Sequence, residues 1–133
     1  MVKTVLIVDD EELISASLKQ RLSGTYHVWT DAAGGPALVR CRETPPDCVL
    51  VDVEMADMDG MDFIFALRRM HPRLPIVVMS GRGMFGILEP LRAAEYFVQG
   101  TLRKPFKYQQ LVKVLRRVMT DGWSGQGRER GSL

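Results

Sequence analysis

The sequence Val5-Leu6-Ile7-Val8-Asp9-Asp10-Glu11-Glu12 places an acidic run directly after an apolar one. The same arrangement recurs at Cys48-Val49-Leu50-Val51-Asp52, and a short run ending at Leu102 leads to Lys104-Pro105. In an open parallel sheet the carboxyl ends of the strands share one edge, and ligands bind in the crevice there. We therefore expect these acids and the lysine to meet in a single pocket. Carboxylates and one ammonium group around a crevice suit a hard divalent cation together with a phosphoryl group.

Length and composition fit one globular domain, since the chain has 133 residues, of which 46% are hydrophobic. The formal net charge of +2 is too small to indicate a nucleic-acid or membrane surface. Cys41 and Cys48 form no CxxC pair, which is typical of free, packed thiols in a reducing compartment. No apolar stretch is long enough to span a bilayer, and the first residues lack a signal-peptide pattern, so a cytoplasmic location is expected.

Apolar runs alternate with helix-like segments, which predicts repeated βα units and a doubly wound parallel sheet of the α/β class. The expected strands are Lys3–Val8, Tyr26–Thr30, Cys48–Val51, Ile76–Met79 and the run ending at Leu102. The expected helices are Glu11–Leu22, Pro36–Glu43, Met61–Met70, a short one starting near Pro90, and Tyr108–Met119. The first helix is expected to bury Leu13, Ile14, Ala16, Ser17, Leu18 and Leu22.

Two regions depart from this regular pattern. Gly81, Gly83 and Gly86 delay the start of the fourth helix, so we expect Gly81–Glu89 to be the most mobile part of the domain. Residues 121–133 are rich in glycine and polar groups, which is typical of a disordered tail or the start of a linker. The predicted domain therefore covers residues 1–120.

Four motifs follow one another in a recognisable order and spacing. They are Leu6-Ile7-Val8-Asp9-Asp10-Glu11, Val49-Leu50-Val51-Asp52 with Met55 and Met58-Asp59-Gly60 behind it, Ser80-Gly81, and Lys104-Pro105-Phe106. In this order they resemble the receiver domains of two-component response regulators, from about Lys3 to Met119. The resemblance implies a flavodoxin-like fold with five strands in the order 2-1-3-4-5 and five helices, of which the fourth is short or irregular.

The resemblance also implies which residues carry the chemistry. Asp52 would be the phosphoacceptor, because an aspartyl carboxylate can attack phosphorus and hold an acyl phosphate. Mg²⁺ would be held by Asp9, Asp10, Asp52 and the backbone carbonyl of Glu54. Helix capping is the simpler role for the Asp9-Asp10 pair, one that Asp10 could also serve.

Three further positions follow from the same resemblance. Lys104 would reach back to Asp52 and then to the phosphoryl oxygens, with a cis peptide bond to Pro105. Ser80 would donate its hydroxyl to a phosphoryl oxygen, and Gly81 would leave open access beside the acceptor. The simpler roles are a surface lysine at a strand end and a turn serine.

The sequence departs from the family pattern at several positions. Thr101 stands where the family usually carries the tyrosine or phenylalanine of a rotamer switch, and Ala56 stands in place of a proline. Phe85, Tyr96 and Phe97 are aromatic residues nearby in sequence, and one of them is a candidate to replace the missing ring. The interval from Ser80 to Lys104 is longer than usual. The output surface is therefore expected to differ from that of typical members.

The resemblance implies a phosphoacceptor switch that is not an enzyme acting on other molecules. It would take a phosphoryl group from a histidine kinase or a histidine phosphotransfer protein, and act on a downstream protein or a fused output domain. No DNA-binding motif lies within these residues, and no membrane partner is expected. One alternative is a phosphorylation-independent docking module. Another is an aspartate-nucleophile phosphatase, which Val53-Glu54 after Asp52 and the lack of a cap insertion disfavour.

Overall fold

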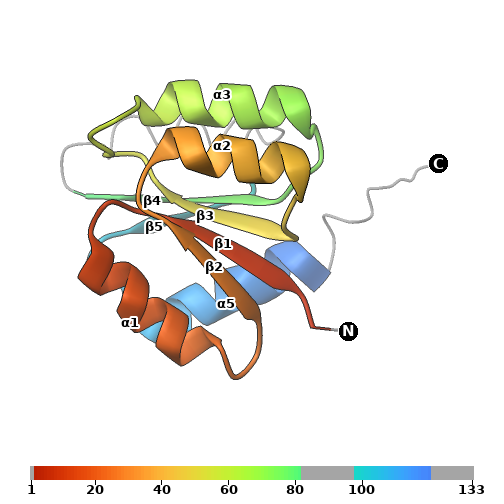
Figure 1. Ribbon diagram of the computed structural model, residues 1–133. Coiled ribbons are helices and arrows are strands. Elements are labelled where there is room, and N and C mark those ends of the chain that lie inside the picture. The colour runs from red at the N-terminus through yellow and green to blue at the C-terminus, as the bar shows by residue number, and fades with distance from the viewer. Residues whose placement is uncertain (1, 82–97, 121–133) are drawn as a thin grey trace.

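The computed structural model describes residues 2–81 and 98–120, in which five parallel strands form one sheet of order β2-β1-β3-β4-β5. The strands are β1 (Thr4–Val8), β2 (His27–Asp31), β3 (Cys48–Asp52), β4 (Ile76–Ser80) and β5 (Gly100–Arg103). The helices of this part are α1 (Glu12–Leu22), α2 (Gly34–Glu43), α3 (Gly60–Met70) and α5 (Tyr108–Thr120). Helices α2 and α3 cover one face and α1 and α5 the other (Figure 1). The predicted doubly wound fold is confirmed.

The sheet has a separate hydrophobic core on each face, because successive side chains of a strand point in opposite directions. Leu6 and Val8 of β1 pack on the α2–α3 side, where Phe63 of α3 is fully buried. Val5 and Ile7 pack on the α1–α5 side. Strands β3 and β4 are buried along their whole length, as expected for central strands covered on both faces.

The two cysteines are buried free thiols, as the sequence predicted. Cys41 of α2 belongs to one core and Cys48 of β3 to the other. Burial raises the pKa of the Cys41 thiol to about 11, and it also raises that of Cys48. Both side chains therefore stay protonated at neutral pH and contribute packing rather than reactivity.

Helix α1 buries a different stripe from the one predicted. Ser15, Leu18 and Leu22 are buried, whereas Leu13 keeps 88% of its surface exposed. Ala16 and Ser17 are exposed as well, so that half of the predicted face was wrong. The buried residues are three and four positions apart and so form one helical stripe, in which the hydroxyl of Ser15 donates to the backbone carbonyl of Asp9 at 3.5 Å. Leu13 is five residues from Leu18 and nine from Leu22, so it lies off this stripe and faces outward.

Helix α2 begins at Gly34, two residues before the predicted start at Pro36. The side chain of Asp57, from the loop between β3 and α3, accepts hydrogen bonds from the Gly34 and Gly35 amides at 2.9 and 3.2 Å. Amides of a first helical turn have no partner within the helix, so a carboxylate placed there stabilises the earlier start.

Other boundaries differ by a single residue. Strand β2 is shifted one residue later than predicted, because its register pairs Thr4 with His27 and Val8 with Asp31. Asp52 and Ser80 are the last residues of their strands rather than the residues that follow them. The predicted helix near Pro90, residues 82–89 of the segment expected to be mobile, the aromatics Phe85, Tyr96 and Phe97, and the tail 121–133 lie outside the described residues.

At the amino-terminal edge of the sheet, Arg68 of α3 is buried and joins three segments. Its guanidinium donates to the carbonyl oxygens of His71 at 3.0 Å and Leu74 at 2.7 Å, and to the side-chain oxygen of Gln99 at 3.1 Å. The same Gln99 oxygen accepts the backbone amide of Ile76, the first residue of β4, at 2.8 Å. Burial lowers the pKa of Arg68 to about 10, which leaves the group charged at neutral pH.

Gly60, the first residue of α3, lies against the backbone that follows the acidic end of β3. A Cβ atom at this position would lie 2.5 Å from both the Cα and the carbonyl oxygen of Val53. Backbone atoms cannot give way as the end of a flexible side chain can. The approach of α3 to the end of β3 therefore requires glycine.

We expect Gly60→Ala to lower the free energy of unfolding by at least about 2 kcal/mol, because the added methyl group overpacks a rigid contact. Chemical denaturation measures this change. Gly24→Ala is the matched control, since a Cβ at Gly24 meets nothing within 4 Å. Equal stabilities for the two variants would contradict the close approach of Gly60 to Val53.

Candidate functional site

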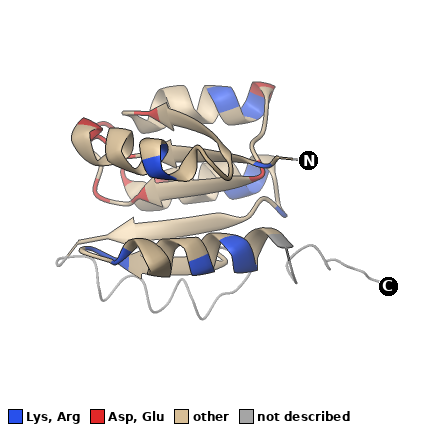
Figure 2. Ribbon diagram, turned by 90° about the horizontal axis from the view of Figure 1, so that it is seen from below, with Lys and Arg blue, Asp and Glu red and all other residues tan. Residues whose placement is uncertain are grey.

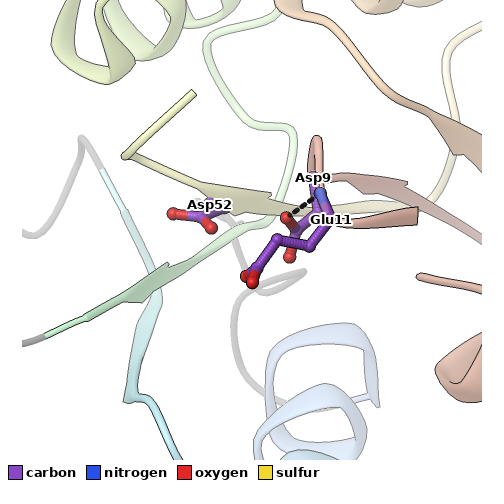
Figure 3. Close-up of side chains that lie close together, drawn as sticks. All are labelled: Asp9, Glu11 and Asp52. Atoms are coloured by element: carbon purple, nitrogen blue, oxygen red, sulfur yellow. Dashed lines mark hydrogen bonds between the residues drawn. The ribbon is translucent and has the colours of Figure 1, made fainter. Parts of the chain in front are cut away.

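Three segments that are distant in sequence converge at the carboxyl end of the sheet on one ammonium group. Lys104 Nζ, just after β5, donates to Asp52 Oδ2 at 2.8 Å, Asp9 Oδ2 at 2.9 Å and Glu11 Oε1 at 3.0 Å. Asp9 and Asp52 are buried, with 1% and 3% of their surface exposed, whereas Glu11 is exposed. Figure 3 shows the three acidic side chains gathered between the ends of β1 and β3.

Each buried acid divides its two oxygens between a backbone amide and the lysine. Asp9 Oδ1 accepts the amide of Glu11 at 2.9 Å, which is the dashed line in Figure 3. Asp52 Oδ1 accepts the amide of Glu54 at 2.8 Å. Both Oδ2 atoms face Lys104. Hydrogen bonds from a side chain to the amide two residues later form a turn that fixes both carboxylates at the ends of β1 and β3, because the side chain replaces a backbone acceptor.

The charges in this cluster are not balanced, since one ammonium serves three carboxylates. Burial raises the pKa of Asp9, although the Glu11 amide and Lys104 act in the opposite direction. Burial would lower the pKa of Lys104, but its hydrogen bonds to Asp52, Asp9 and Glu11 outweigh it and raise that pKa. Lys104 is therefore charged at neutral pH, and the excess negative charge favours a further cation.

Acidic residues gather more widely at this end of the molecule. Figure 2 shows Asp and Glu concentrated where the strand arrows point, while Lys and Arg lie mainly along the helices. A crevice lined by one sign of charge attracts counter-ions.

Asp10 does not belong to the group of close carboxylates, in which Glu11 takes part instead. The Asp10 side chain is exposed and accepts the backbone amide of Ala56 at 2.9 Å, so it holds the loop after β3. Nor does it cap α1, whose N-cap is Glu11 without a side-chain hydrogen bond. Sequence reasoning missed Glu11. The only available indication was its position two residues after Asp9, within the span of one such turn.

Ser80 and Lys104 meet at the ends of β4 and β5. The backbone amide of Lys104 donates to the carbonyl of Ser80 at 2.7 Å, and the Lys104–Pro105 peptide bond is cis, as the resemblance implied. The Ser80 side chain is fully buried, and within residues 2–81 and 98–120 its hydroxyl has no hydrogen-bond partner. Thr101 is half-buried in β5, where it pairs with Val78 of β4.

The space beside Gly81 is not open. Its backbone amide donates to Glu54 Oε1 at 3.0 Å, and a Cβ atom at Gly81 would lie 2.7 Å from the same oxygen. The Glu54 side chain therefore lies across the gap between the ends of β3 and β4. The sequence did not indicate this contact.

A protein-family model described as the response regulator receiver domain matches residues 5–116 of this chain. The chain belongs to that family. It is thus a receiver domain of the two-component signalling type, and the fold, the acidic cluster and the motifs agree with this membership.

Curated proteins similar to this receiver domain include regulators of different lengths. Transcriptional regulatory protein PrrA of Mycobacterium leprae is 36% identical over 110 residues, which are 81% of this chain and 46% of that protein. Chemotaxis protein CheY of Thermotoga maritima is 31% identical over 121 residues, which are 89% of this chain and 98% of that protein. The chain spans about half the length of the PrrA proteins that it matches.

Solved structures agree on the fold. Chemotaxis response regulator CheY4 of Vibrio cholerae superimposes with a TM-score of 0.78 at 30% identity, covering 89% of this chain and 99% of that one. A CheY-like receiver domain protein of Methanospirillum hungatei gives a TM-score of 0.84 at 21% identity, covering 96% and 100%. Within residues 2–81 and 98–120, none of the helices has the length and apolar character needed to cross a membrane.

We expect Asp57→Asn to lower the melting temperature at pH 7 by about 3 °C, because it weakens the anchor between the acidic loop and α2. The Gly34 and Gly35 amides lower the pKa of Asp57 below its ordinary value of 3.8. Its stabilising effect is therefore complete above that value and disappears as the pH falls through the lower, folded-state pKa.

Thermal unfolding between pH 7 and pH 2 measures this difference. Glu43→Gln, at the other end of α2, serves as the charge-matched control. A deficit for Asp57→Asn that stays constant down to pH 2 would contradict the role of the carboxylate charge.

Proposed function

We propose that this receiver domain accepts a phosphoryl group on Asp52 in the presence of Mg²⁺ and then presents a changed surface to a partner. The supporting observation is the sharing of the Lys104 ammonium between Asp52 and two further carboxylates. A cluster with excess negative charge beside a buried carboxylate suits a cation and a phosphoryl group, and family membership supports the same chemistry.

Asp52 is the proposed nucleophile. One carboxylate oxygen attacks the phosphorus of the donor, the P–O bond to Asp52 forms, and the bond from phosphorus to the donor atom breaks. Lys104, 2.8 Å from Asp52 Oδ2, reduces the repulsion between the carboxylate and the incoming phosphoryl oxygens. The Glu54 amide on Asp52 Oδ1 keeps the group oriented.

The donor set fits Mg²⁺, because every candidate ligand is an oxygen atom and two of the carboxylates are buried without full charge compensation. The proposed ligands are Asp9, Asp10, Asp52 and the backbone carbonyl of Glu54. Bound there, Mg²⁺ would neutralise charge on the acceptor and on the phosphoryl oxygens. Glu11, which contacts Lys104 at 3.0 Å, is a further oxygen donor at the edge of this group.

The proposed response to phosphorylation involves Ser80, whose buried hydroxyl is available to donate to a phosphoryl oxygen. The phosphoryl group adds about two negative charges, and Lys104 follows it away from Asp9 and Glu11. Gly81 and Pro105 support the two segments that would rearrange. Thr101 carries no aromatic ring, so the coupling differs from a ring rotation at that position.

The proposed partners are a histidine kinase or a histidine phosphotransfer protein as donor, and a downstream protein or fused output domain as target. The chain covers 46% of PrrA, which is named as a transcriptional regulator, and 98% of CheY, so both long and short relatives exist. We assign residues 1–120 to the receiver domain and 121–133 to a tail or linker. The domain would act in the cytoplasm, and it would promote only its own phosphorylation and dephosphorylation.

We expect Asp52→Asn to abolish phosphoryl uptake from acetyl phosphate with Mg²⁺, because the amide is a poor nucleophile of almost the same volume. Mass spectrometry and hydroxylamine release measure the acyl phosphate, and circular dichroism checks the fold. Asp62→Asn, an exposed acid in the first turn of α3, should keep full uptake. Phosphorylation of the Asp52→Asn variant would refute the acceptor, and no uptake by the wild type would favour the docking module.

We expect Mg²⁺ to raise the melting temperature, since a cation that binds only the folded state stabilises it by mass action. At ten times its dissociation constant the gain is about 1.4 kcal/mol, or roughly 5 °C. The shift should be largely lost in Asp9→Asn, which removes a buried carboxylate. NaCl at equal ionic strength is the control. A melting temperature that Mg²⁺ leaves unchanged, without NMR shifts near Asp52, would argue against the metal site.

A further inference from the structure

The Glu54 carboxylate already occupies a backbone donor beside the proposed acceptor. Gly81 follows Ser80 directly, and its amide donates to Glu54 Oε1 at 3.0 Å. Ser80 itself is fully buried, and its hydroxyl lacks a partner in the part of the chain that the structure describes. Two neighbouring donors thus lie at the end of β4, next to β3, and a carboxylate holds one of them.

Two backbone contacts hold Glu54 in place within the loop between β3 and α3. The Glu54 amide donates to Asp52 Oδ1 at 2.8 Å, and Glu54 forms an isolated antiparallel bridge with Asp59, the N-cap residue of α3. On the other strand, the register pairs Asp52 with Met79, and the amide of Val53 donates to the Met79 carbonyl at 3.1 Å. The side chain of Glu54 therefore extends from beside Asp52 to the residue after Ser80.

We propose that Glu54 is an internal competitor of the phosphoryl group, whose carboxylate must leave the Gly81 amide before a phosphoryl group on Asp52 can use the donors of Ser80 and Gly81. This inference rests on the proposed function. The Glu54 carboxylate and the phosphoryl group are both anions whose oxygen atoms accept hydrogen bonds from N–H and O–H donors. They cannot occupy the same donor together, and their like charges repel.

The consequence is a domain with a raised threshold for activation. A ligand of an activated state loses apparent affinity in proportion to the fraction of molecules that are not competent to bind it. The resting contact between the Glu54 carboxylate and the Gly81 amide would keep the competent fraction low. Glu54 then sets how readily the domain responds to a phosphoryl group on Asp52.

The first test is the affinity for beryllofluoride, a phosphoryl analogue, at saturating Mg²⁺, measured by calorimetry. We expect Glu54→Ala to bind about tenfold more tightly than the wild type, since it removes a charged hydrogen-bond acceptor. Glu54→Gln should gain less, because its amide oxygen can still accept from Gly81. Glu12→Gln, an exposed acid in the first turn of α1, controls for net charge and should match the wild type.

The second test separates the hydrogen bond from general charge repulsion. In Gly81→Ala the new Cβ would lie 2.7 Å from Glu54 Oε1, so the carboxylate has to shift, and we expect its hydrogen bond to the amide to weaken while its charge remains. Glycines with positive φ are absent from the described residues, so alanine fits this backbone. We expect Glu54→Ala to bring a much smaller gain in a Gly81→Ala background, because interacting residues are not additive.

The NMR signal of the Gly81 amide gives the direct readout. It should shift in free Glu54→Ala relative to the wild type, and the two should converge once beryllofluoride is bound. Equal affinities of Glu54→Ala, Glu54→Gln and wild type would overturn the inference, as would an equal gain from Glu54→Ala in both Gly81 backgrounds. Failure of the wild type itself to bind beryllofluoride or to take up a phosphoryl group would instead refute the proposed function, and the inference with it.

Discussion

The ammonium group of Lys104 holds the carboxyl end of the sheet together. Asp9 and Asp52 are both buried there, and without a cation between them two neighbouring carboxylates in a poorly solvated site would repel strongly. Lys104 comes from the segment after β5 and bridges the ends of β1 and β3, so it also joins the edge of the sheet to its centre. In the proposed function, Mg²⁺ binds the carboxylates of this cluster and the phosphoryl group binds the Lys104 ammonium, so the lysine is the group that changes partners.

The loop between β3 and α3 keeps its shape through carboxylates that accept backbone amides. Asp10 holds Ala56 from outside the loop, while Asp57 reaches across to the start of α2 and Asp59 caps α3. Hydrogen bonds to charged acceptors are stronger than those between neutral groups. The acids of this region therefore have two uses. Asp9, Glu11 and Asp52 contact Lys104, and Asp10, Asp57 and Asp59 fix the backbone around Asp52.

The sequence predicted those features that depend on strand order and on the ends of strands. Asp9, Asp52 and Lys104 meet because parallel strands share one edge, which the alternation of apolar runs and helices already indicated. The contacts of Glu11 and Glu54 were not predictable in this way. The first depends on a turn at Asp9, and the second joins residues 27 positions apart across two strand ends. The outward position of Leu13, by contrast, agrees with helical periodicity, because Ser15, Leu18 and Leu22 form the buried stripe and Leu13 lies off it.

Strand β4 is held at its two ends by contacts of different kinds. At Ile76 the side-chain oxygen of Gln99 accepts the backbone amide. The Arg68 guanidinium donates to the same oxygen and to the carbonyl oxygen of Leu74. At the other end, the carbonyl oxygen of Ser80 accepts the backbone amide of Lys104, next to the acidic cluster. In the proposed function, a phosphoryl group on Asp52 would act at the Ser80 end of β4. The contacts of Gln99 and Arg68 at Ile76 would then hold the other end of β4 in place, so that a response to phosphorylation starts at Ser80.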